Sequence, residues 1–178
     1  MVREQNGLLI RDAMPEDAEQ LCRWWNDGRI MEHAGFPNGL GVTADTLRKR
    51  LQDQAAGRGN GNHLLIIEWQ ERPIGEMNVR PFSTEVCEIG IKICDAGMQN
   101  RGVGKRVLSL LIHSLFREYG YRQIVLDTSL ENGRAQHVYE QLGFRKVRVN
   151  RDSWTDQLGR LRSSVDYELT EDRFCPFE

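Results

Sequence analysis

The chain lacks any long apolar segment. No stretch approaches the roughly 18 apolar residues that a helix needs to span a bilayer, and the opening MVREQNGLLIRD has an apolar run of only three residues, too short for the core of a signal peptide. With 28% charged and 39% hydrophobic residues, the composition is that of a soluble globular protein. We therefore expect a cytoplasmic protein without a membrane partner.

A large charge excess is also missing. The formal net charge is −2, which gives no general attraction to nucleic acid. Basic residues gather between positions 145 and 162, but Asp152 and Asp156 interrupt them. A solvated surface is therefore favoured over an RNA-binding or ribosome-binding face, and we expect no nucleic-acid partner.

The cysteines lack the pattern of a metal site. Cys22, Cys87, Cys94 and Cys175 form no CxxC pair and have no histidine at ligand spacing. We therefore expect no bound metal, and small buried side chains are the usual role of such cysteines. Cys87 and Cys94 are an odd number of residues apart, so a strand would turn them to opposite faces.

The length and the spacing of apolar residues predict one domain over 1–178 that mixes strands and helices. A crossover of strand, long helix and strand between positions 86 and 128 predicts one parallel pair of strands. The remaining strands form hairpins, which are antiparallel. The strands are expected at 7–11, 63–69, 73–79, 86–93, 123–128, 144–149 and 164–169, and the helices at 15–26, from 43 onward, at 103–119 and at 132–142.

The stretch GMQNRGVGKR, residues 97–106, is typical of a loop that opens a helix and accepts an anion. A Walker A loop would need a lysine where Val103 stands, and a dinucleotide-binding fingerprint would need a third glycine where Val107 stands. Neither nucleotide motif fits. On the glycines alone, a plain strand-to-helix turn remains an open alternative.

Two motifs together give the chain a family resemblance. The segment from Gln99 to Gly104 (QNRGVG) resembles the Q/R-x-x-G-x-G/A motif of the GCN5-related N-acetyltransferases, and the spacing of Asn132, Tyr139 and Gly143-Phe144 resembles that family's second signature. The expected order of elements also resembles the family over nearly the whole chain. The resemblance implies a mixed α/β (α+β) fold. Its sheet is mostly antiparallel with six to seven strands and a splayed parallel central pair, and about four helices accompany it.

The same resemblance implies acetyl-CoA as co-substrate. Backbone N–H groups of the loop and first helical turn would hold the pyrophosphate, and glycines at 102 and 104 would leave room for it. Backbone groups near Ile91 and Ile93 would contact the pantetheine arm and polarise the thioester, although a shift of one residue would bring in Cys94. The implied coenzyme-binding residues are Ile91, Ile93, Gln99, Asn100, Arg101, Gly102, Val103, Gly104, Lys105 and Asn132.

The resemblance also implies catalytic roles. Tyr139 matches the family tyrosine that stands near the coenzyme sulfur as general acid, although a core tyrosine would have the same spacing. Glu88 stands where relatives often carry a catalytic glutamate that acts as base directly or through water, and Glu76 on the neighbouring strand is its competitor. Both glutamates could equally be solvent-facing strand charges.

These residues predict transfer of an acetyl group to a primary amine by direct attack on the thioester. The acceptor would be a small cationic amine or a protein N-terminus, as in the group of ribosomal-protein, aminoglycoside and polyamine acetyltransferases that the chain resembles. Convergence of Glu32, Glu76 and Glu88 on the cleft would favour a small cation. The alternative is a regulatory module that binds acetyl-CoA without turnover. Relatives are commonly dimers, so a homodimer stays open.

Overall fold

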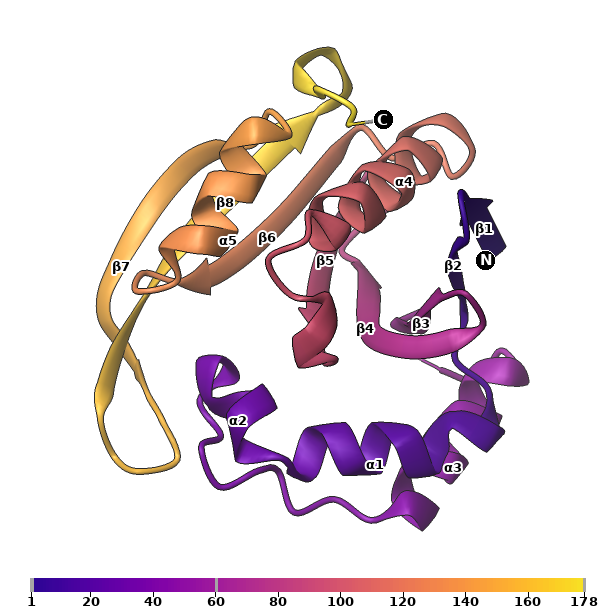
Figure 1. Cartoon of the computed structure of the whole chain (residues 1–178). Helices are drawn as coiled ribbons and strands as arrows, with labels where there is room; N and C mark the ends of the chain where they lie inside the picture. Colours follow the sequence, from indigo (N-terminus) through magenta and orange to yellow (C-terminus); the bar gives the residue numbers. More distant parts are fainter. Residues whose placement is uncertain (1, 60, 178) are drawn as a thin grey trace.

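The computed structural model describes residues 2–59 and 61–177, which form one eight-stranded sheet with helices on both faces (Figure 1). The strand order is β1-β2-β3-β4-β5-β6-β8-β7. Neighbouring strands are antiparallel except for β5 and β6, which run parallel. The fold class expected from the sequence is therefore confirmed.

The elements have the following bounds. The strands are β1 Val2–Gln5, β2 Leu8–Asp12, β3 His63–Trp69, β4 Arg72–Pro81, β5 Val86–Ile93, β6 Gln123–Ser129, β7 Arg145–Thr155 and β8 Leu161–Thr170. The α-helices are α1 Ala18–Asn26, α2 Gly28–Met31, α3 Ala44–Ala55, α4 Val103–Arg117 and α5 Gly133–Gln141. Short 3-10 turns cover Pro15–Asp17, Glu32–Ala34, Ala96–Met98 and Glu171–Arg173.

Two of these elements were not expected. β1 pairs with β2 through a turn in which Asn6 and Gly7 have positive φ, and α2 is a single turn that Asp27 caps by accepting a hydrogen bond from the Arg29 N–H at 2.9 Å. Both are too short to show a hydrophobic period, so no residue pattern predicts them. The described chain thus has one strand and one helix more than predicted.

The helices bury apolar side chains against the two faces of the sheet. α4 packs on one face, in a core with Leu65, Ile67, Ile89 and Ile124. α1 and α3 cover the other face, against Leu64 and Ile66 of β3. Alternate residues of β3 therefore supply opposite cores, as the pleat of a strand requires.

Strand β5 alternates in the same way. Cys87 and Ile89 are buried in the α4 core, whereas Cys94, just beyond the strand, is buried in the α1–α3 core. The predicted opposite orientation of the two cysteines is confirmed. Burial raises the pKa of each thiol to about 12, so both remain protonated and unreactive near neutral pH.

The parallel pair β5–β6 is in register over a short length only. Val86, Cys87 and Glu88 lie opposite Gln123, Ile124 and Val125, and beyond these three pairs the strands are no longer neighbours. Residues 89–93 and 126–129 therefore continue on two diverging strands (Figure 1). The predicted splayed pair is present, and α4 begins beside the wide end of the splay.

Two strand predictions need correction. The closing hairpin is longer than predicted, since β7 reaches Thr155 and β8 begins at Leu161. β7 is an exposed edge strand with polar residues on both faces, a device that discourages edge-to-edge pairing and removes the alternating pattern. β6 was expected to be buried on both faces, but only Ile124, Leu126 and Ser129 are buried, while Asp127 is exposed.

The helices in the described ranges can be compared with the length that a bilayer requires. None of these helices combines the length and the apolar character that a membrane crossing requires.

The glycine after α5 offers a test of the packing. Gly143 has a φ of +97°, and a Cβ there would lie 2.0 Å from the Arg173 carbonyl oxygen, whereas Gly120 after α4 has a φ of +74° and open space around it. Gly120→Ala should lower the free energy of unfolding by about 1 kcal/mol, the cost of the left-handed backbone. Gly143→Ala should cost about 3 kcal/mol because the C-terminal segment must also shift.

Urea unfolding of both variants checks this difference. Equal losses at the two glycines would show that the contact between Gly143 and Arg173 does not constrain the backbone.

Candidate active site

The loop before α4 ends in a helix start that has no side-chain cap. Gly102 is the N-cap residue, with a φ of +74°, and Asn100 also has a positive φ. Among the described residues, no group accepts a hydrogen bond from the N–H groups of Val103, Gly104 or Lys105. Three donors and the positive end of the helix dipole therefore point out of the first turn, an arrangement that suits an anion.

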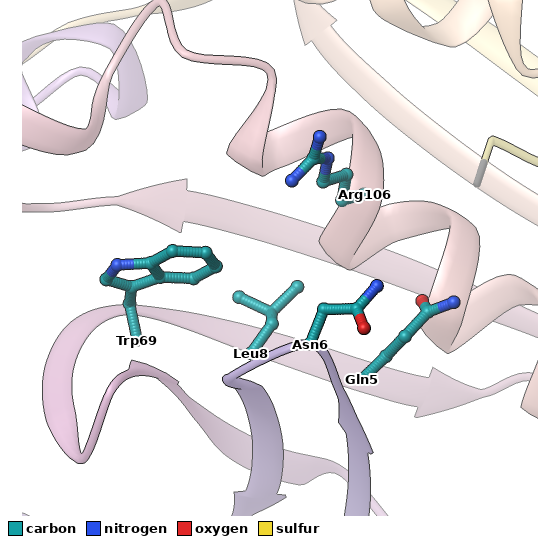
Figure 2. Close-up of a pocket in the computed structure, with 5 residues that line it drawn as sticks. All are labelled: Gln5, Asn6, Leu8, Trp69 and Arg106. Atoms are coloured by element: carbon teal, nitrogen blue, oxygen red, sulfur yellow. The ribbon is translucent and has the colours of Figure 1, made fainter.

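The basic side chains of this turn lie in different surroundings. The Lys105 ammonium lies 4.2 Å from the centre of the Phe177 ring. Arg106 lines a pocket of about 260 Å³ together with Leu8 and Trp69, and its side chain lies beside the first turns of α4 (Figure 2). Lys105 therefore already has an aromatic partner, and its backbone N–H is the group that it offers at the helix start.

Gly102 and Gly104 differ in what their positions require of the residue. Gly102 needs its positive φ, although a Cβ there would meet no atom within 4 Å. A Cβ on Gly104 would make an ordinary contact of 3.8 Å with Ile93, so the fold itself tolerates a side chain at 104. The protein's own packing therefore does not require a glycine at 104, and room for a ligand there stays a prediction.

Hydrogen bonds to β4 fix the direction of the β5 backbone. Phe82 N–H donates to the Val86 carbonyl and Cys94 N–H donates to the Ile74 carbonyl, each at 2.8 Å. Since bonding alternates along an antiparallel strand, the backbone groups of the odd-numbered residues, including Ile91 and Ile93, point away from β4 and into the splay. The Cys94 N–H points to β4, so the one-residue shift considered for the sequence does not fit the register.

Gln99 joins the loop to the end of β5. Its side-chain Nε2 donates to the Ile93 carbonyl at 2.9 Å, so one of the backbone groups that face the splay already has a partner. The neighbouring Asn100 and Arg101 are exposed. A coenzyme role for these residues stays a prediction.

Tyr139 lies on α5 with only 7% of its surface exposed. Its ring packs against the rings of Phe144 and Tyr167, each with centroids 5.8 Å away, and its hydroxyl makes no hydrogen bond within the described part of the chain. Burial raises the pKa of Tyr139 to about 12, and the negative charge of Asp127 contributes. The phenol therefore keeps its proton at neutral pH, as a general acid must.

Asn132 caps α5, since its Oδ1 accepts from the Ala135 N–H at 3.2 Å. The amide nitrogen of the same side chain makes no hydrogen bond to a described residue. The cap orients this side chain at the start of α5 and leaves its donor side for another partner.

The two candidate glutamates both carry a compensating cation. Glu76 is 3% exposed and accepts hydrogen bonds from Lys92 Nζ at 2.9 Å and Trp25 Nε1 at 3.3 Å. Glu88 pairs with Arg80 at 2.9 Å, and 30% of its side chain is exposed. Glu32 sits on a surface turn, 4.0 Å from His33. Glu76 and Glu88 therefore each already pair with a cation, and the expected convergence of the three glutamates on the cleft stays a prediction.

The neighbouring strand β6 carries a further carboxylate, Asp127, which was not predicted from the sequence. Asp127 lies two residues beyond the last β5–β6 pair, on the face of the sheet that carries Glu88. Although Asp127 is exposed, the atoms packed around its carboxyl remove part of its hydration and raise its pKa. Asp166 opposite it on β8 raises the pKa further, while the Asp127 backbone N–H and Arg80 lower it. The only signal was an aspartate inside the apolar run QIVLDT.

The β7–β8 hairpin joins the loop after α2 on this second face of the sheet (Figure 1). The Gln157 N–H donates to the Gly35 carbonyl, its Oε1 accepts from the Asn38 N–H, and its Nε2 donates to the Gly39 carbonyl, at 2.8, 2.8 and 2.9 Å. Trp154 leaves no room for a Cβ on Gly35. We call this contact of Gln157 with residues 35–39 the clasp.

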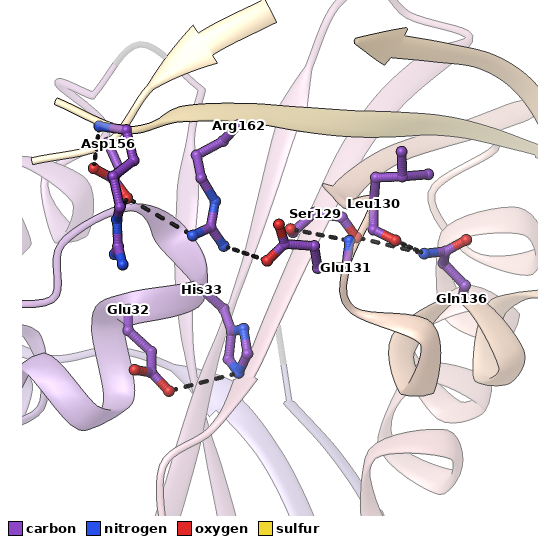
Figure 3. Close-up of polar contacts among 9 residues, drawn as sticks. Glu32, His33, Ser129, Leu130, Glu131, Gln136, Asp156 and Arg162 are labelled. Atoms are coloured by element: carbon purple, nitrogen blue, oxygen red, sulfur yellow. Dashed lines mark hydrogen bonds and ion pairs between the residues drawn. The ribbon is translucent and has the colours of Figure 1, made fainter. Parts of the chain in front are cut away.

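Ion pairs hold the hairpin in shape beside the clasp. Arg162 bridges Glu131 at 3.0 Å and the buried Asp156 at 3.7 Å, and Arg160 binds Asp156 at 2.8 Å (Figure 3). Figure 3 also shows Gln136 of α5 bonded to the Leu130 carbonyl, which fixes the turn that carries Glu131. The basic residues that the sequence presents as a cluster are thus largely paired within the fold.

Metal ligands do not gather in the described ranges. No group of three or more His, Cys, Asp or Glu side chains there has an arrangement that would hold a metal ion.

The clasp can be tested by removing one side chain. Gln157→Ala removes the hydrogen bonds to Asn38 and Gly39 and should lower the free energy of unfolding by about 1–2 kcal/mol. Leu158→Ala on the same turn, where the side chain is exposed, is the control and should change it by less than about 0.5 kcal/mol. Urea unfolding measures both, and hydrogen exchange should accelerate at residues 35–39 in the first variant alone. Unchanged exchange there would show that the clasp does not order the loop.

Solved structures share this fold over nearly the whole chain. A spermidine N-acetyltransferase from Vibrio cholerae, crystallised with CoA and spermine, aligns with a TM-score of 0.82 at 18% identity and covers 95% of this chain and 98% of its own. A ribosomal-protein-S5-alanine acetyltransferase from Vibrio fischeri aligns with a TM-score of 0.81 at 16% identity, covering 99% and 100%. At such identities the likeness establishes the fold alone.

Sequence comparison gives the family. An uncharacterised protein of Methanocaldococcus jannaschii is 23% identical over 156 residues, which cover 85% of this chain but only 31% of the relative, so the chain spans about a third of that protein's length. The family model of the acetyltransferase (GNAT) domain matches residues 7–145. That match includes the uncapped start of α4, the β5–β6 splay and Tyr139, and the chain belongs to the GNAT family of acetyltransferases.

Proposed function

We propose that this acetyltransferase moves the acetyl group of acetyl-CoA to a primary amine by direct attack of the amine on the thioester. The observation that carries the proposal is the end of the β5–β6 pairing at Glu88 and Val125, beside the uncapped first turn of α4. One short region thus combines outward-facing backbone groups with an anion-binding helix start. A bound acetyl-CoA would supply the activated acyl group there.

The chain's own groups fit a coenzyme with a pyrophosphate and an amide-bearing arm. The N–H groups of Val103, Gly104 and Lys105 would hold the pyrophosphate, with Gly102 setting the turn. Backbone groups of Ile91 would pair with the arm as a neighbouring strand would, and Ile93 would offer its N–H because Gln99 occupies its carbonyl. The Asn132 amide nitrogen is the remaining donor at the start of α5.

Tyr139 would act as general acid. Its pKa of about 12 keeps the phenol protonated across the neutral range, so that the hydroxyl can donate to the departing sulfur as negative charge develops there. A carboxylate on the opposite face of the sheet would take the proton of the amine. Glu88 is the candidate from the sequence, acting directly or through water, whereas the buried ion pair of Glu76 with Lys92 makes Glu76 a structural residue.

The acceptor is proposed to be a small cationic amine or a protein N-terminus. The structural neighbours include enzymes named for spermidine and for a ribosomal protein's alanine. Both acceptor types present a protonated amine, so in each case the ammonium group must lose a proton before its nitrogen can attack the thioester. We further propose a cytoplasmic location, which four free cysteines support.

The direct test measures thiol release from acetyl-CoA with a panel of polyamines, aminoglycosides and N-terminal peptides. Saturable turnover with one class would establish both the activity and the acceptor class. Tight acetyl-CoA binding by calorimetry, together with an intact acetyl group after incubation with every amine, would instead identify a binding module without turnover.

Gly104→Asp should abolish coenzyme binding. The substitution places a side chain and a negative charge against the pyrophosphate, while the first turn of α4 tolerates both Cβ and carboxylate. Gly104→Ala and Gly104→Asn are the matched controls, since they add bulk without charge and should weaken binding in stages. Calorimetry with CoA measures the affinities and thermal unfolding checks the fold. Unchanged affinity in Gly104→Asp would refute the placement of the pyrophosphate.

Tyr139→Phe should lower kcat by roughly 10²-fold while the affinity for CoA stays the same. The hydroxyl has no hydrogen-bond partner among the described residues, so its removal should leave the melting temperature within about 1 °C. Single-turnover kinetics and calorimetry separate the two effects. An unaltered kcat would give the role of acid to water or another residue.

A further inference from the structure

We propose that Asp127 takes the proton from the acceptor's ammonium group, so that the neutral amine forms at the open end of the β5–β6 splay. The proposal rests on the acetyl transfer described above. Asp127 thereby replaces Glu88, the candidate from the sequence, as the proton acceptor. Glu88 keeps a positioning role through its ion pair with Arg80.

Strand register places Asp127 at the opening. Glu88 of β5 lies beside Val125 of β6, and these residues share a face of the sheet. Asp127 is two residues further along β6, hence on the same face, at the level where β5 is no longer its neighbour. At the corresponding height β5 carries Gly90, which has no side chain, and Asn78 of β4 fills the space behind it.

Asp127 differs from the other carboxylates on this face in its partners. Glu88 binds Arg80, and Asp166 binds Arg148 at 3.2 Å. Among the described residues Asp127 has neither an ion pair nor a hydrogen bond to another side chain. A carboxylate without a cation of its own can accept a proton or hold an ammonium group, whereas a paired carboxylate must first give up its partner.

Asp127 and Tyr139 approach the splay from opposite faces. Tyr139 belongs to the core beneath α5, and Asp127 lies on the face of Glu88. They nonetheless interact electrostatically, since the charge of Asp127 contributes to the raised pKa of Tyr139. A base on the acceptor side and an acid on the coenzyme side of the same opening are the two groups that amine acetylation requires.

The neighbours of Asp127 keep its basicity above that of an ordinary aspartate. Partial loss of hydration around the carboxyl and the like charge of Asp166 raise its pKa, and Arg80 lowers it by less. The charged and titratable groups around it come from every adjoining element: Arg80 of β4, Glu88 of β5, Arg148 of β7, Asp166 of β8 and Tyr139 of α5.

The protons and electron pairs balance as follows. The ammonium R–NH₃⁺ gives one proton to the Asp127 carboxylate, and the freed lone pair forms the C–N bond at the thioester carbonyl. As the C–S bond breaks, sulfur keeps the bonding pair and takes the Tyr139 proton. The amide nitrogen then returns its extra proton to the tyrosinate, and Asp127 releases its proton to water.

The decisive experiment compares Asp127→Asn with wild type from pH 6 to 10, using the amine that wild type acetylates best. Asp127→Asn should lower kcat/KM by roughly 10²-fold or more at pH 7 with unchanged CoA affinity. The loss should shrink about tenfold per pH unit toward pH 10, because free amine then forms without a base. Asp127→Glu should recover part of the rate, and Glu88→Gln should lose less than Asp127→Asn.

A second readout does not depend on turnover. A carboxyl whose pKa is raised in the folded state destabilises the fold where it is ionised, so the fold loses stability as pH rises through that group's titration range. Asp127→Asn should therefore have a higher melting temperature than wild type at pH 8, and the difference should vanish near pH 3.

The outcomes separate the two proposals. If wild type is active, two results would overturn the role of Asp127 and leave acetyl transfer standing. One is a kcat/KM of Asp127→Asn within twofold of wild type at pH 7, and the other is a loss of kcat/KM that stays constant from pH 6 to 10. A larger loss in Glu88→Gln would return the role to Glu88. No turnover by wild type with any amine would overturn both, and no gain in melting temperature at pH 8 would overturn the environment that we assign to Asp127.

Discussion

The rest of the structure depends on an interruption in hydrogen bonding between two parallel strands. β5 and β6 pair through Val86–Glu88 and Gln123–Val125 and then separate. Backbone N–H and C=O groups in a sheet need partners, and leaving them unpaired is unfavourable unless water or a ligand satisfies them. The chain itself satisfies one of these groups, since the Gln99 side chain donates a hydrogen bond to the Ile93 carbonyl. The remaining groups define a place for an extended, amide-bearing ligand.

The sheet also separates two kinds of chemistry. On the face covered by α4 and α5 lie the uncapped helix start and the buried hydroxyl of Tyr139, which suit an anion and proton donation. On the other face lie the carboxylates Glu88 and Asp127, which suit a cation. The two faces meet where β5 and β6 part. A donor and an acceptor that approach from opposite faces meet there without competing for one surface.

Much of this arrangement could be predicted from local sequence. The glycines of the loop, the cap at Asn132 and the stop at Gly143 are short-range signals, and the α4 helix has a wide apolar face. Local sequence does not predict three other features: the long polar hairpin, the ion-pair partner of each glutamate and the position of Asp127. They depend on strand register and on pairs such as Asn38 with Gln157, 119 positions apart, for which a single sequence carries no periodic signal.

The clasp has a mechanical consequence. The sheet consists of two blocks, β1–β5 and β6–β8–β7, that meet along one short seam and touch again where Gln157 binds residues 35–39. Loosening the seam would expose Cys87 and Ile124, both fully buried, whereas opening the clasp would break the hydrogen bonds of Gln157 and the packing of Trp154 on Gly35. The compliant joint of the molecule is therefore the clasp, and the rigid one is the seam beside the reacting groups.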